Sequence, residues 1–334
     1  MTQVLLEGLG AVGIRAARQL VDTPGVDALL IASRSSTRAA EVATALGDRA
    51  HAVELRPDDP LPTGVDAVAV SLPSAVVAQR AERALASATP LAAASDDAEA
   101  IDAVLTLNAA AQSSDLLIAP SCGLAPGLAD VLTRHAADAL DTVDEIHVAR
   151  AGAAGPASMA ALRRALREPA LEWSDGDWRE ERHPNPELVW FPDPIGAREC
   201  APVTVGAALL VRTFRDVHRV TMRFAEPFVR RFALPGRRGL DDGWGSTRVE
   251  VWGWRGQTRE SMVYGVIDRT ALAAGTVLAL TAARLAGAAP GLAARSGPSA
   301  GVHGLGSLVE PVPFLAELAR RGVKAAVFEG VAVA

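Results

Sequence analysis

Three glycines near the amino end of the chain have the spacing of a nucleotide-binding turn. They stand in QVLLEGLGAVGIRAARQL, after a short apolar run and before a segment with helical periodicity. The first glycine of such a turn permits a tight bend, the second lets backbone approach a pyrophosphate, and the third lets helix and strand pack closely. The first N–H groups of the helix then face the phosphates. The pattern predicts a dinucleotide site, and the alternative is a glycine-rich turn that binds nothing. The residues expected to bind the cofactor here are Gly8, Gly10, Ala11, Val12 and Gly13.

The residues after the second apolar run indicate which dinucleotide is preferred. The run DALLIA (27–32) is followed by Ser33, Arg34 and Ser35. A site for NAD(H) carries Asp or Glu at this position to bind the ribose 2′-hydroxyl, whereas a guanidinium suits a 2′-phosphate. We therefore expect NADP(H) rather than NAD(H). The alternative is that Arg34 and the nearby Arg38 are exposed charges at the start of a helix.

Further strands and helices alternate through residue 119, which predicts a doubly wound parallel sheet. Ligands of such sheets bind at the carboxyl ends of the strands. Asp96 follows one of these strands and is a candidate catalytic residue, although helix capping is the favoured interpretation of Asp96 and Asp97. The other residues expected near the cofactor at these strand ends are Ser71, Leu72, Pro73, Ser95, Cys122 and Gly123.

The segment PSCGLAPGLADVL (120–132) joins a strand to a helix and combines a cysteine with proline and glycine. We expect Pro126 in the first turn of the helix, where a missing N–H has no cost, with Ala125 as a cap that lacks a side-chain acceptor. The uncapped helix start then contacts the nicotinamide end of the cofactor or a substrate carboxylate. The alternative is that Gly127 only allows two backbones to pack closely. A small buried packing residue is the favoured interpretation of Cys122, ahead of a nucleophile.

The second half of the chain predicts a different kind of sheet. Alternating polar and apolar residues indicate strands, two of which are joined at RGQT (255–258) as an antiparallel hairpin. We expect helices to cover one face of this sheet and the other domain to complete a pocket. The stretch from about 170 to 205 is rich in Trp, Pro, Asp and Glu and is expected to be a loop. The expected strands lie at 142–152, 218–224, 246–254 and 260–268, and a basic helix is expected at 159–169.

Few residue types remain for the catalytic chemistry. Tyr264 is the only tyrosine and residue 268 is Asp, so a Tyr-x-x-x-Lys arrangement is excluded. Lys324 is the only lysine, which leaves little room for Schiff-base chemistry. An amino-acid substrate would need a cation for its carboxylate, and a proton must reach or leave the reacting group. The candidates are Arg198 and Arg269 for the carboxylate, and His303 or Asp96 for the proton.

Composition excludes several classes of function. The chain has 334 residues, 49% of them apolar, and a net charge of −6, so we expect no nucleic-acid partner. The two cysteines lie far apart without metal-type spacing, and we expect neither a disulfide nor a metal site. The longest apolar stretch, at 271–283, is too short to span a bilayer. The chain begins without a basic leader, so we expect a cytoplasmic location and no membrane association.

Several motifs together resemble the saccharopine dehydrogenase-like family, within it the lysine 6-dehydrogenase-type branch. The resemblance covers essentially the whole chain, and its most specific part is the GLAPGL turn. It implies a Rossmann domain, a second α/β domain with the substrate pocket, NAD(P)-dependent chemistry at an amino or imino carbon, and a homodimer. The chain departs from the members that rely on a catalytic lysine. The motifs, in order, are GLGAVG, SDD, CGLAPGLADVL, GDWREE, FPDPIGAR, VEVWGW, AAGTVLALTAARLA and GVHGLGSLVEP.

We therefore expect an α/β protein with a Rossmann domain over 1–124 and a substrate and dimerisation domain over 125–288. A final segment, 289–334, is expected to return to the Rossmann domain. The expected function is NADP(H)-dependent amine oxidation or imine reduction on a small amino-acid-like molecule. The alternatives are a carbonyl or hydroxyl dehydrogenase on the same scaffold and a redox sensor that binds NADP(H) without catalysis.

Overall fold

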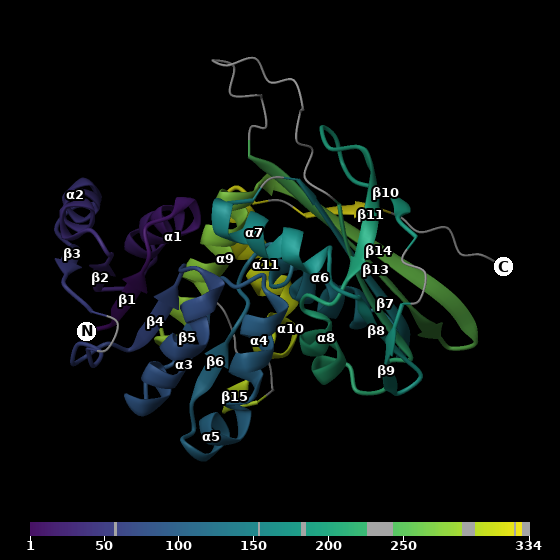
Figure 1. Ribbon diagram of the computed structural model, residues 1–334, viewed down its shortest axis with the longest axis horizontal. Helices are drawn as coiled ribbons and strands as arrows, with labels where there is room; N and C mark the ends of the chain where they lie inside the picture. The colour runs from purple at the N-terminus through teal and green to yellow at the C-terminus, as the bar shows by residue number, and fades with distance from the viewer. Residues whose placement is uncertain are drawn as a thin grey trace.

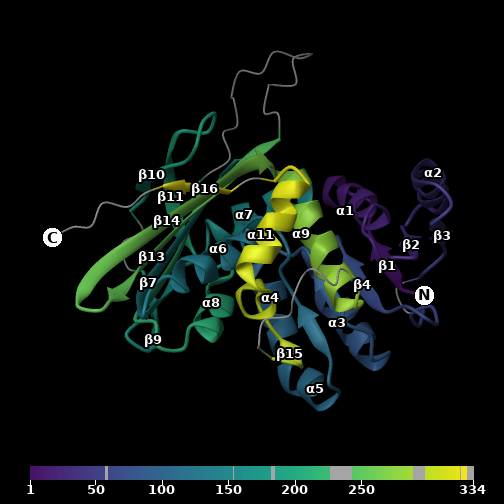
Figure 2. The same ribbon diagram turned by 180° about the vertical axis from the view of Figure 1, so that it is seen from behind.

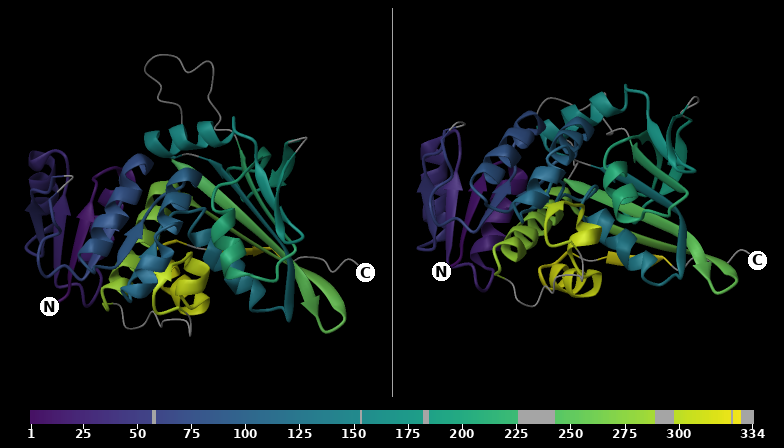
Figure 3. Two further views of the ribbon diagram at one scale, coloured as in Figure 1. Left: turned by 60° about the horizontal axis from the view of Figure 1, so that its bottom comes forward. Right: turned by 90° about the horizontal axis from the view of Figure 1, so that it is seen from below.

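The computed structural model describes most of the chain. The described residues are 1–56, 59–152, 154–181, 185–225, 243–288 and 298–323, together with the backbone of 325–328; Lys324 lies outside them. Two sheets lie side by side along the long axis of the molecule (Figure 1, Figure 3). Among the described helices, none combines the length and the hydropathy that crossing a lipid bilayer requires.

The first sheet has seven parallel strands in the order β15-β6-β5-β4-β1-β2-β3. Apart from the added β15, this is the 3-2-1-4-5-6 order of the Rossmann fold, in which the strand order reverses between β1 and β4. Every residue of β2, β4 and β5 is buried, as is typical of parallel strands covered on both faces. The bounds are β1 Gln3–Glu7, β2 Ala28–Ala32, β3 Ala50–Val53, β4 Ala67–Val70, β5 Leu91–Ala93, β6 Leu117–Ala119 and β15 Gly301–Val302. The prediction of a doubly wound sheet is confirmed.

Helices cover both faces of this sheet. One apolar core joins it to α1 and α9, and a separate core joins its other face to α3 and α4. Between β5 and β6 the chain forms two helices, α4 and α5, which are separated at residues 106–107. The bounds are α1 Ala11–Val21, α2 Ser36–Leu46, η1 Ser74–Val76, α3 Val77–Ala86, α4 Ala98–Leu105, α5 Asn108–Ser113 and α9 Thr270–Leu285.

The second sheet has nine strands and is mixed, with β12 and β7 as its parallel pair. Strands β13 and β14 form the predicted hairpin, with Arg255 opposite Thr258 at its end. One face packs against α6 and α8, so the prediction of a sheet covered by helices is confirmed. The strand bounds are β7 Thr142–Gly152, β8 Leu171–Ser174, β9 Asp177–Glu180, β10 Glu187–Trp190, β11 Ala197–Val203, β12 Arg219–Ala225, β13 Trp244–Arg255, β14 Thr258–Arg269 and β16 Ala325–Phe328. The remaining helices are α6 Leu128–Ala137, α7 Pro156–Ala165, α8 Ala207–Thr213, α10 Leu305–Leu308 and α11 Pro311–Arg320.

The prediction of a loop from about 170 to 205 is wrong. This stretch contains β8, β9, β10 and β11. Trp173 of β8 stands opposite Trp178 of β9, with ring centroids 5.4 Å apart in an edge-to-face arrangement. The Trp173 indole also donates a hydrogen bond of 3.0 Å to the Val217 carbonyl. Cross-strand aromatic pairs of this kind stabilise hairpins, and they outweigh the turn-forming residues around them.

Two segments from the second half of the chain, β15 and α9, pack on the first sheet. Strand β15 pairs with β6. Strand β16, in contrast, pairs with β14 in the second sheet. Helix α9, which follows β14, packs against α1, β4 and β5 (Figure 2). Gly275 lies at the contact of α9 with α1, where an added Cβ would stand 2.6 Å from Arg15 Cβ and 2.8 Å from the Val12 carbonyl oxygen. The α1–α9 contact therefore requires a residue without a side chain at this position.

The Gly275→Ala substitution is predicted to lower the free energy of unfolding by about 1–3 kcal/mol, because it forces α9 away from α1. This loss opposes the gain of up to about 1 kcal/mol that alanine brings to a helix interior. Urea unfolding of the variant and the parent measures the difference. The matched control is Gly155→Ala, where an added Cβ meets no atom within 4 Å. If Gly275→Ala were no less stable than the parent protein, the close contact of α1 with α9 would be contradicted.

Candidate functional site

Two of the three glycines after β1 are required by packing. Gly8 has a φ of +100° and donates a 3.0 Å hydrogen bond to the Ala32 carbonyl. A Cβ on Gly8 would overlap the carbonyl oxygen of Ser71, and one on Gly13 would overlap the carbonyl oxygen of Gly8. These contacts bring the start of α1 against the carboxyl ends of β1 and β4. The expected roles of the first and third glycine, a tight bend and a close helix–strand contact, correspond to these positions.

Gly10 is different, because nothing in the protein requires a glycine there. Its φ of −72° and ψ of −175° are open to any residue, and an added Cβ would meet no atom within 4 Å. Gly10 is the N-cap of α1, and no side chain caps the helix; Ala11 is exposed and Val12 half-buried. The unpaired N–H groups and the positive end of the helix dipole therefore face open space at the switch point of the sheet. This cradle fits the pyrophosphate of a dinucleotide.

The end of β2 presents hydroxyl groups and a guanidinium. Ser33 is half-buried, while Arg34 and Ser35 are exposed. The Ser35 hydroxyl accepts a 3.2 Å hydrogen bond from the Arg38 backbone N–H and caps α2. No acidic residue stands at 33–38, so no carboxylate from this segment can bind a ribose hydroxyl. Arg34 remains available for an anionic group.

Strands β4, β5 and β6 also end along this edge, and neighbouring strands there are roughly 4.8 Å apart. After β4, the Ser71 backbone packs on Gly8, Leu72 is half-buried, and Pro73 precedes η1. After β5, Ser95 is 2% exposed and its hydroxyl has no hydrogen-bond partner in the described part of the chain. A buried hydroxyl without a partner is costly, and a polar ligand group that it can bind removes the cost.

Asp96 and Asp97 join the edge of the first sheet to the second domain. Asp97 accepts a hydrogen bond from a backbone N–H in the first turn of α4, as a helix cap does, and pairs with Arg164 of α7. The Asp96 carboxylate pairs with Arg150 of β7 at 2.9 Å, and the same guanidinium nitrogen donates a 3.0 Å hydrogen bond to the Ala125 carbonyl. Capping thus accounts for Asp97, whereas Asp96 lies in a polar contact between the domains.

Sequence reasoning missed Arg150, which is 8% exposed. The sequence of β7 did indicate that Arg150 would be buried. Ile146, Val148 and Arg150 lie on the same face of the strand, and the first two are buried in the core shared with the helices. An arginine on the apolar side of a strand needs an anionic partner.

The corner at 120–132 differs from its prediction. Helix α6 begins at Leu128 with Gly127 as its N-cap, so Pro126 is outside the helix and Ala125 is not the cap. Gly127 has a φ of +122°, and an added Cβ would stand 2.5 Å from both N and O of Gly123. The chain folds back on itself here, which leaves no room for a helical turn at the proline. Close packing of two backbones, the alternative interpretation, is what the structure contains.

The same corner contacts the second domain and buries its cysteine. An added Cβ at Gly206 would overlap the Pro126 ring, so the proline packs directly on the start of α8. Cys122 is fully buried and its N–H donates to the Ala93 carbonyl at 2.7 Å. Burial raises the pKa of the Cys122 thiol to about 12, so the side chain is not a thiolate at neutral pH.

Asp130, in the first turn of α6, is a buried carboxyl that sequence reasoning did not identify. It is 2% exposed, and both of its carboxylate oxygens are buried. Burial raises the pKa of Asp130 to about 7, against the opposing influence of the N–H groups of Gly127 and Leu305. The sequence did contain a signal for a role of Asp130 at the helix start. It lies three residues after the N-cap Gly127, a position from which a carboxylate reaches back to the first turn.

The remaining catalytic candidates lie on separate elements. Arg198 is exposed on β11 and donates to its neighbour's carbonyl, Ala197, at 2.8 Å. Arg269 is exposed at the N-cap of α9. His303 follows β15, half-buried, and burial lowers its pKa. Within the described residues no hydrogen bond or ion pair joins any two of these three side chains to each other or to Asp96. In the same residues no group of three or more His, Cys, Asp or Glu is placed to hold a metal ion.

Comparison with known proteins finds similarity in structure alone. No family model and no curated protein matches the sequence. The structure resembles apo saccharopine dehydrogenase (L-Glu forming) from Saccharomyces cerevisiae with a TM-score of 0.69, 14% identity, and coverage of 98% of this chain and 100% of that one. It also resembles C. glutamicum DAP dehydrogenase in complex with DAP, with a TM-score of 0.54, 16% identity and coverage of 96% and 99%. A third similar structure is amine dehydrogenase from Mycobacterium smegmatis, with a TM-score of 0.54, 11% identity and coverage of 92% and 96%. The chain has the two-domain fold of these dehydrogenases, as the resemblance implied.

The Asp130→Asn substitution is predicted to change how stability depends on pH. The pKa of Asp130 in the folded protein, about 7, lies above its ordinary value of 3.8, so between these values the folded protein holds a proton that the unfolded chain has released. The parent protein therefore loses stability relative to Asp130→Asn as pH rises from about 4 to about 7. The difference grows by up to about 1.4 kcal/mol per pH unit and is constant above pH 7.

Urea unfolding at half-unit steps from pH 4.5 to 8.5 measures this difference. Asp22→Asn, at an aspartate whose side chain is 65% exposed, is the control and should follow the parent profile. Parallel profiles for the parent and Asp130→Asn would contradict the raised pKa.

Proposed function

We propose that the protein is an NADP(H)-dependent oxidoreductase that acts on a C–N bond of a small amino-acid-like substrate. The observation that carries the proposal is Gly10, a glycine that the fold does not require, placed before an uncapped helix at the switch point of a Rossmann sheet. The buried Ser95 hydroxyl without a partner, two strands further along the same edge, supports it. Both features suit a dinucleotide lying along the carboxyl ends of the strands.

The preference for NADP(H) is supported by the end of β2. Arg34 is exposed there, and residues 33–38 offer no carboxylate to bind a ribose 2′-hydroxyl. A 2′-phosphate would receive charge-assisted hydrogen bonds from the guanidinium and a further one from the Ser33 hydroxyl. The Ser35 hydroxyl already caps α2, so we assign it a structural role.

The choice of a nitrogen-containing substrate rests on two kinds of likeness. The motifs of the sequence resemble saccharopine dehydrogenase-like proteins, and the similar structures include saccharopine, DAP and amine dehydrogenases. The first of these is described as L-Glu forming, and an amino acid such as L-Glu carries both an amine and a carboxylate. Arg198 and Arg269 are our candidates to bind such a carboxylate.

The cofactor supplies or accepts a hydride at the substrate carbon, and the chain's own residues position the substrate and carry the proton. The Asp96 carboxylate, held by Arg150, is a fixed acceptor for an ammonium or iminium N–H group. His303 Nε2 lies 2.9 Å from the Ala300 carbonyl, so this nitrogen donates and the neutral imidazole keeps Nδ1 as an acceptor. Either group could take up a proton during amine oxidation.

We include a homodimer in the proposal. Strand β10 is an edge of the second sheet, and it exposes two large apolar side chains. Leu188 is 64% exposed and Trp190 is 69% exposed. Exposed apolar side chains on a sheet edge are typical of surfaces that pair with another chain.

A second candidate function is a redox sensor that binds NADP(H) without turnover. Its support is that the candidate catalytic side chains come from four separate parts of the chain, and that no hydrogen bond or ion pair joins them among the described residues. These candidates are Asp96, Arg198, Arg269 and His303. A carbonyl or hydroxyl dehydrogenase on the same scaffold is a further alternative within enzymes.

A turnover screen is predicted to distinguish these functions. We expect NADPH consumption with imines formed from small amines and 2-oxo acids, and little with the oxo acids alone. Absorbance at the NADPH band measures the rate. Turnover with carbonyl compounds alone would favour the alternative dehydrogenase. Saturable NADPH binding without turnover on any substrate would favour the sensor.

The Arg34→Asp substitution is predicted to reverse the cofactor preference. It removes the cation for the 2′-phosphate and supplies a carboxylate for the 2′-hydroxyl, so the ratio of NADPH to NADH affinity should fall at least about tenfold. Fluorescence titration with both nucleotides measures the ratio. Arg215→Asp makes the same charge change at an exposed residue after α8 and should leave the ratio unchanged. An unchanged ratio in Arg34→Asp would contradict the assignment of NADP(H).

A further inference from the structure

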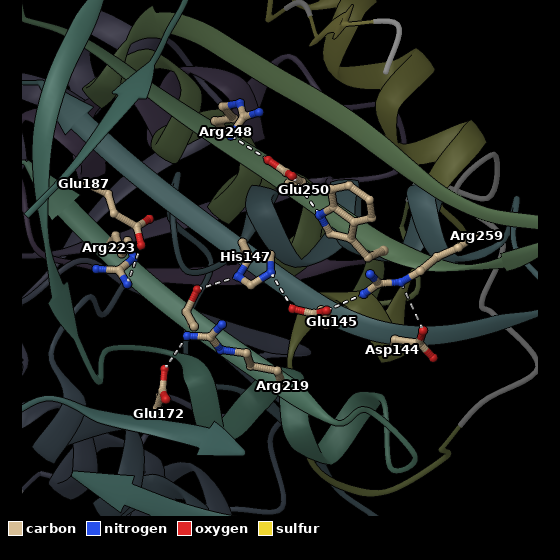
Figure 4. Close-up of polar contacts among 12 residues, drawn as sticks. Asp144, Glu145, His147, Glu172, Glu187, Arg219, Arg223, Arg248, Glu250 and Arg259 are labelled. Carbon is tan, nitrogen blue, oxygen red and sulfur yellow. Dashed lines mark hydrogen bonds and ion pairs between the residues drawn. The ribbon is translucent and has the colours of Figure 1, made fainter. Parts of the chain in front are cut away.

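The second sheet carries a polar hollow on the face that α6 and α8 do not cover. Along β7, Val148 and Arg150 point toward the helices and the first domain, so the intervening Ala149 points to the opposite face. The hollow has a volume of about 230 Å³. Its walls come from β7, β10, β12 and β13 (Figure 4). The lining residues used below are His147, Ala149, Glu187, Arg223, Arg248 and Glu250.

The register of the strands explains why a hollow forms here. Ala149 of β7 stands opposite Arg223 of β12 on one side and Arg248 of β13 on the other. Neighbouring strands are about 4.8 Å apart, so the two arginines leave strands roughly 10 Å apart with only the Ala149 methyl group between them in this row. Val189 of β10 also lines the hollow and belongs to the same buried cluster as Ala149. In the next row, His147 stands between Thr221 and Glu250. The hollow is therefore a gap above Ala149, with a guanidinium on each side.

Internal contacts hold the side chains around this gap in place. Arg223 Nη2 pairs with Glu187 at 2.9 Å, and Arg248 Nη1 pairs with Glu250 at 2.8 Å. Glu250 also accepts a 2.7 Å hydrogen bond from the Trp252 indole. His147 Nδ1 lies 2.8 Å from the Thr221 hydroxyl. A site whose side chains are already fixed loses little conformational entropy when a ligand binds.

One of the two terminal nitrogens of Arg223 lacks a hydrogen-bond acceptor among the described residues. Its side chain is 9% exposed, whereas that of its partner Glu187 is 60% exposed. Its second terminal nitrogen, Nη1, is buried and has no hydrogen-bond partner in the described part of the chain. An unpaired buried N–H group is costly, so ion pairs that serve only the structure should satisfy every buried donor. An anionic oxygen that enters the gap beside Arg223 would accept a hydrogen bond from Nη1 and remove this cost.

The arginines around the hollow are paired with carboxylates. Three arginines line it, and each has a glutamate partner: Arg223 and Arg248 pair with glutamates of the lining, and Arg219 pairs with Glu172 at 3.2 Å. Burial lowers the pKa of His147, although Glu145 and Glu250 oppose this effect and Arg219 adds to it. The imidazole is therefore neutral near pH 7, and the feature that favours an anion is the buried Nη1 of Arg223, which has no acceptor among the described residues. Arg259, on β14, pairs with Glu145 and stacks on Trp252, so it completes the rim without adding a free cation.

We propose that this hollow is a second ligand site, which binds the carboxylate of a small metabolite above Ala149, between Arg223 and Arg248. A guanidinium pair suits a carboxylate because each can donate parallel hydrogen bonds to its two oxygens. Pockets for drug-sized ligands measure roughly 300–1,000 Å³, so the volume of about 230 Å³ limits the ligand to a small molecule. The site is separate from the cofactor edge, and it does not depend on the proposed oxidoreductase function.

Calorimetric titration of the full-length protein tests this site, with succinate, L-glutamate and inorganic phosphate as separate probes. We expect saturable binding of one molecule of succinate or L-glutamate per chain. Affinity should fall at least about tenfold in Arg248→Gln, which removes a charge-assisted contact, and similarly in Ala149→Val, which fills the floor without changing charge. Arg255→Gln, at an arginine on the same strand that does not line the hollow, should bind as the parent does.

Each other outcome overturns the proposal. Absence of saturable carboxylate binding at 10 mM, a concentration about tenfold above a 1 mM dissociation constant, would do so. Equal affinity in the parent, Arg248→Gln and Ala149→Val would place the ligand elsewhere, and binding of phosphate alone would refute the carboxylate class. NADPH affinity, measured on the same samples, should be unchanged in all three variants. A loss of NADPH affinity in Arg248→Gln would show that the hollow is not a separate site.

Discussion

The site depends on how closely the start of α1 approaches the carboxyl edge of the first sheet. Two backbone contacts fix this approach, Gly8 on Ser71 and Gly13 on Gly8, and neither leaves space for a Cβ atom. From the other side, Gly275 lets α9 pack against α1 without a side chain between them. Packing thus holds the helix, and its free N–H groups face the open space beside Gly10. The position of a possible anion site is set before any ligand is present.

The second domain is attached to the same edge by polar contacts. Arg150 binds Asp96 and the Ala125 carbonyl, and Arg164 binds Asp97. The Arg150 guanidinium is almost fully buried, so loss of its partner would leave a charge without compensation. Strand β7 therefore connects the two parts of the molecule, because Arg150 on one of its faces reaches the carboxyl edge of the first sheet. Ala149, on the other face, lines the hollow.

The general fold could be predicted from the sequence because its signals are local. Apolar runs followed by helical periodicity predicted the parallel sheet, and the glycine spacing identified the turn after β1. The two-residue strand β15 is too short to give a recognisable pattern, and β3 was missed because only one of its four residues is buried, so it lacks the buried apolar run of β4 and β5. In the 170–205 region, the pairing of Trp173 with Trp178 outweighed the turn-forming residues, which local propensity does not reveal.

The site could be predicted only in part, because much of it depends on contacts between distant residues. Gly8, Gly10 and Gly13 were identified from their spacing. Pro126 was misplaced because the fold-back of Gly127 on Gly123 and the contact of the proline with Gly206 are tertiary features. The partners of Asp96 and the burial of Asp130 likewise depend on residues far along the chain or on packing. The row of Arg223, Ala149 and Arg248 exists only because three strands meet in one register.

The most direct test of the account is to measure NADPH affinity and stability together in Gly10→Ala. The added Cβ meets no protein atom within 4 Å, so the free energy of unfolding should stay within about 0.5 kcal/mol of the parent value. The methyl group would occupy the space in front of the helix N-terminus, so NADPH affinity should fall at least about tenfold. Unchanged affinity at unchanged stability would contradict the claim that this turn cradles a dinucleotide, and so would a parent protein that binds no NADPH.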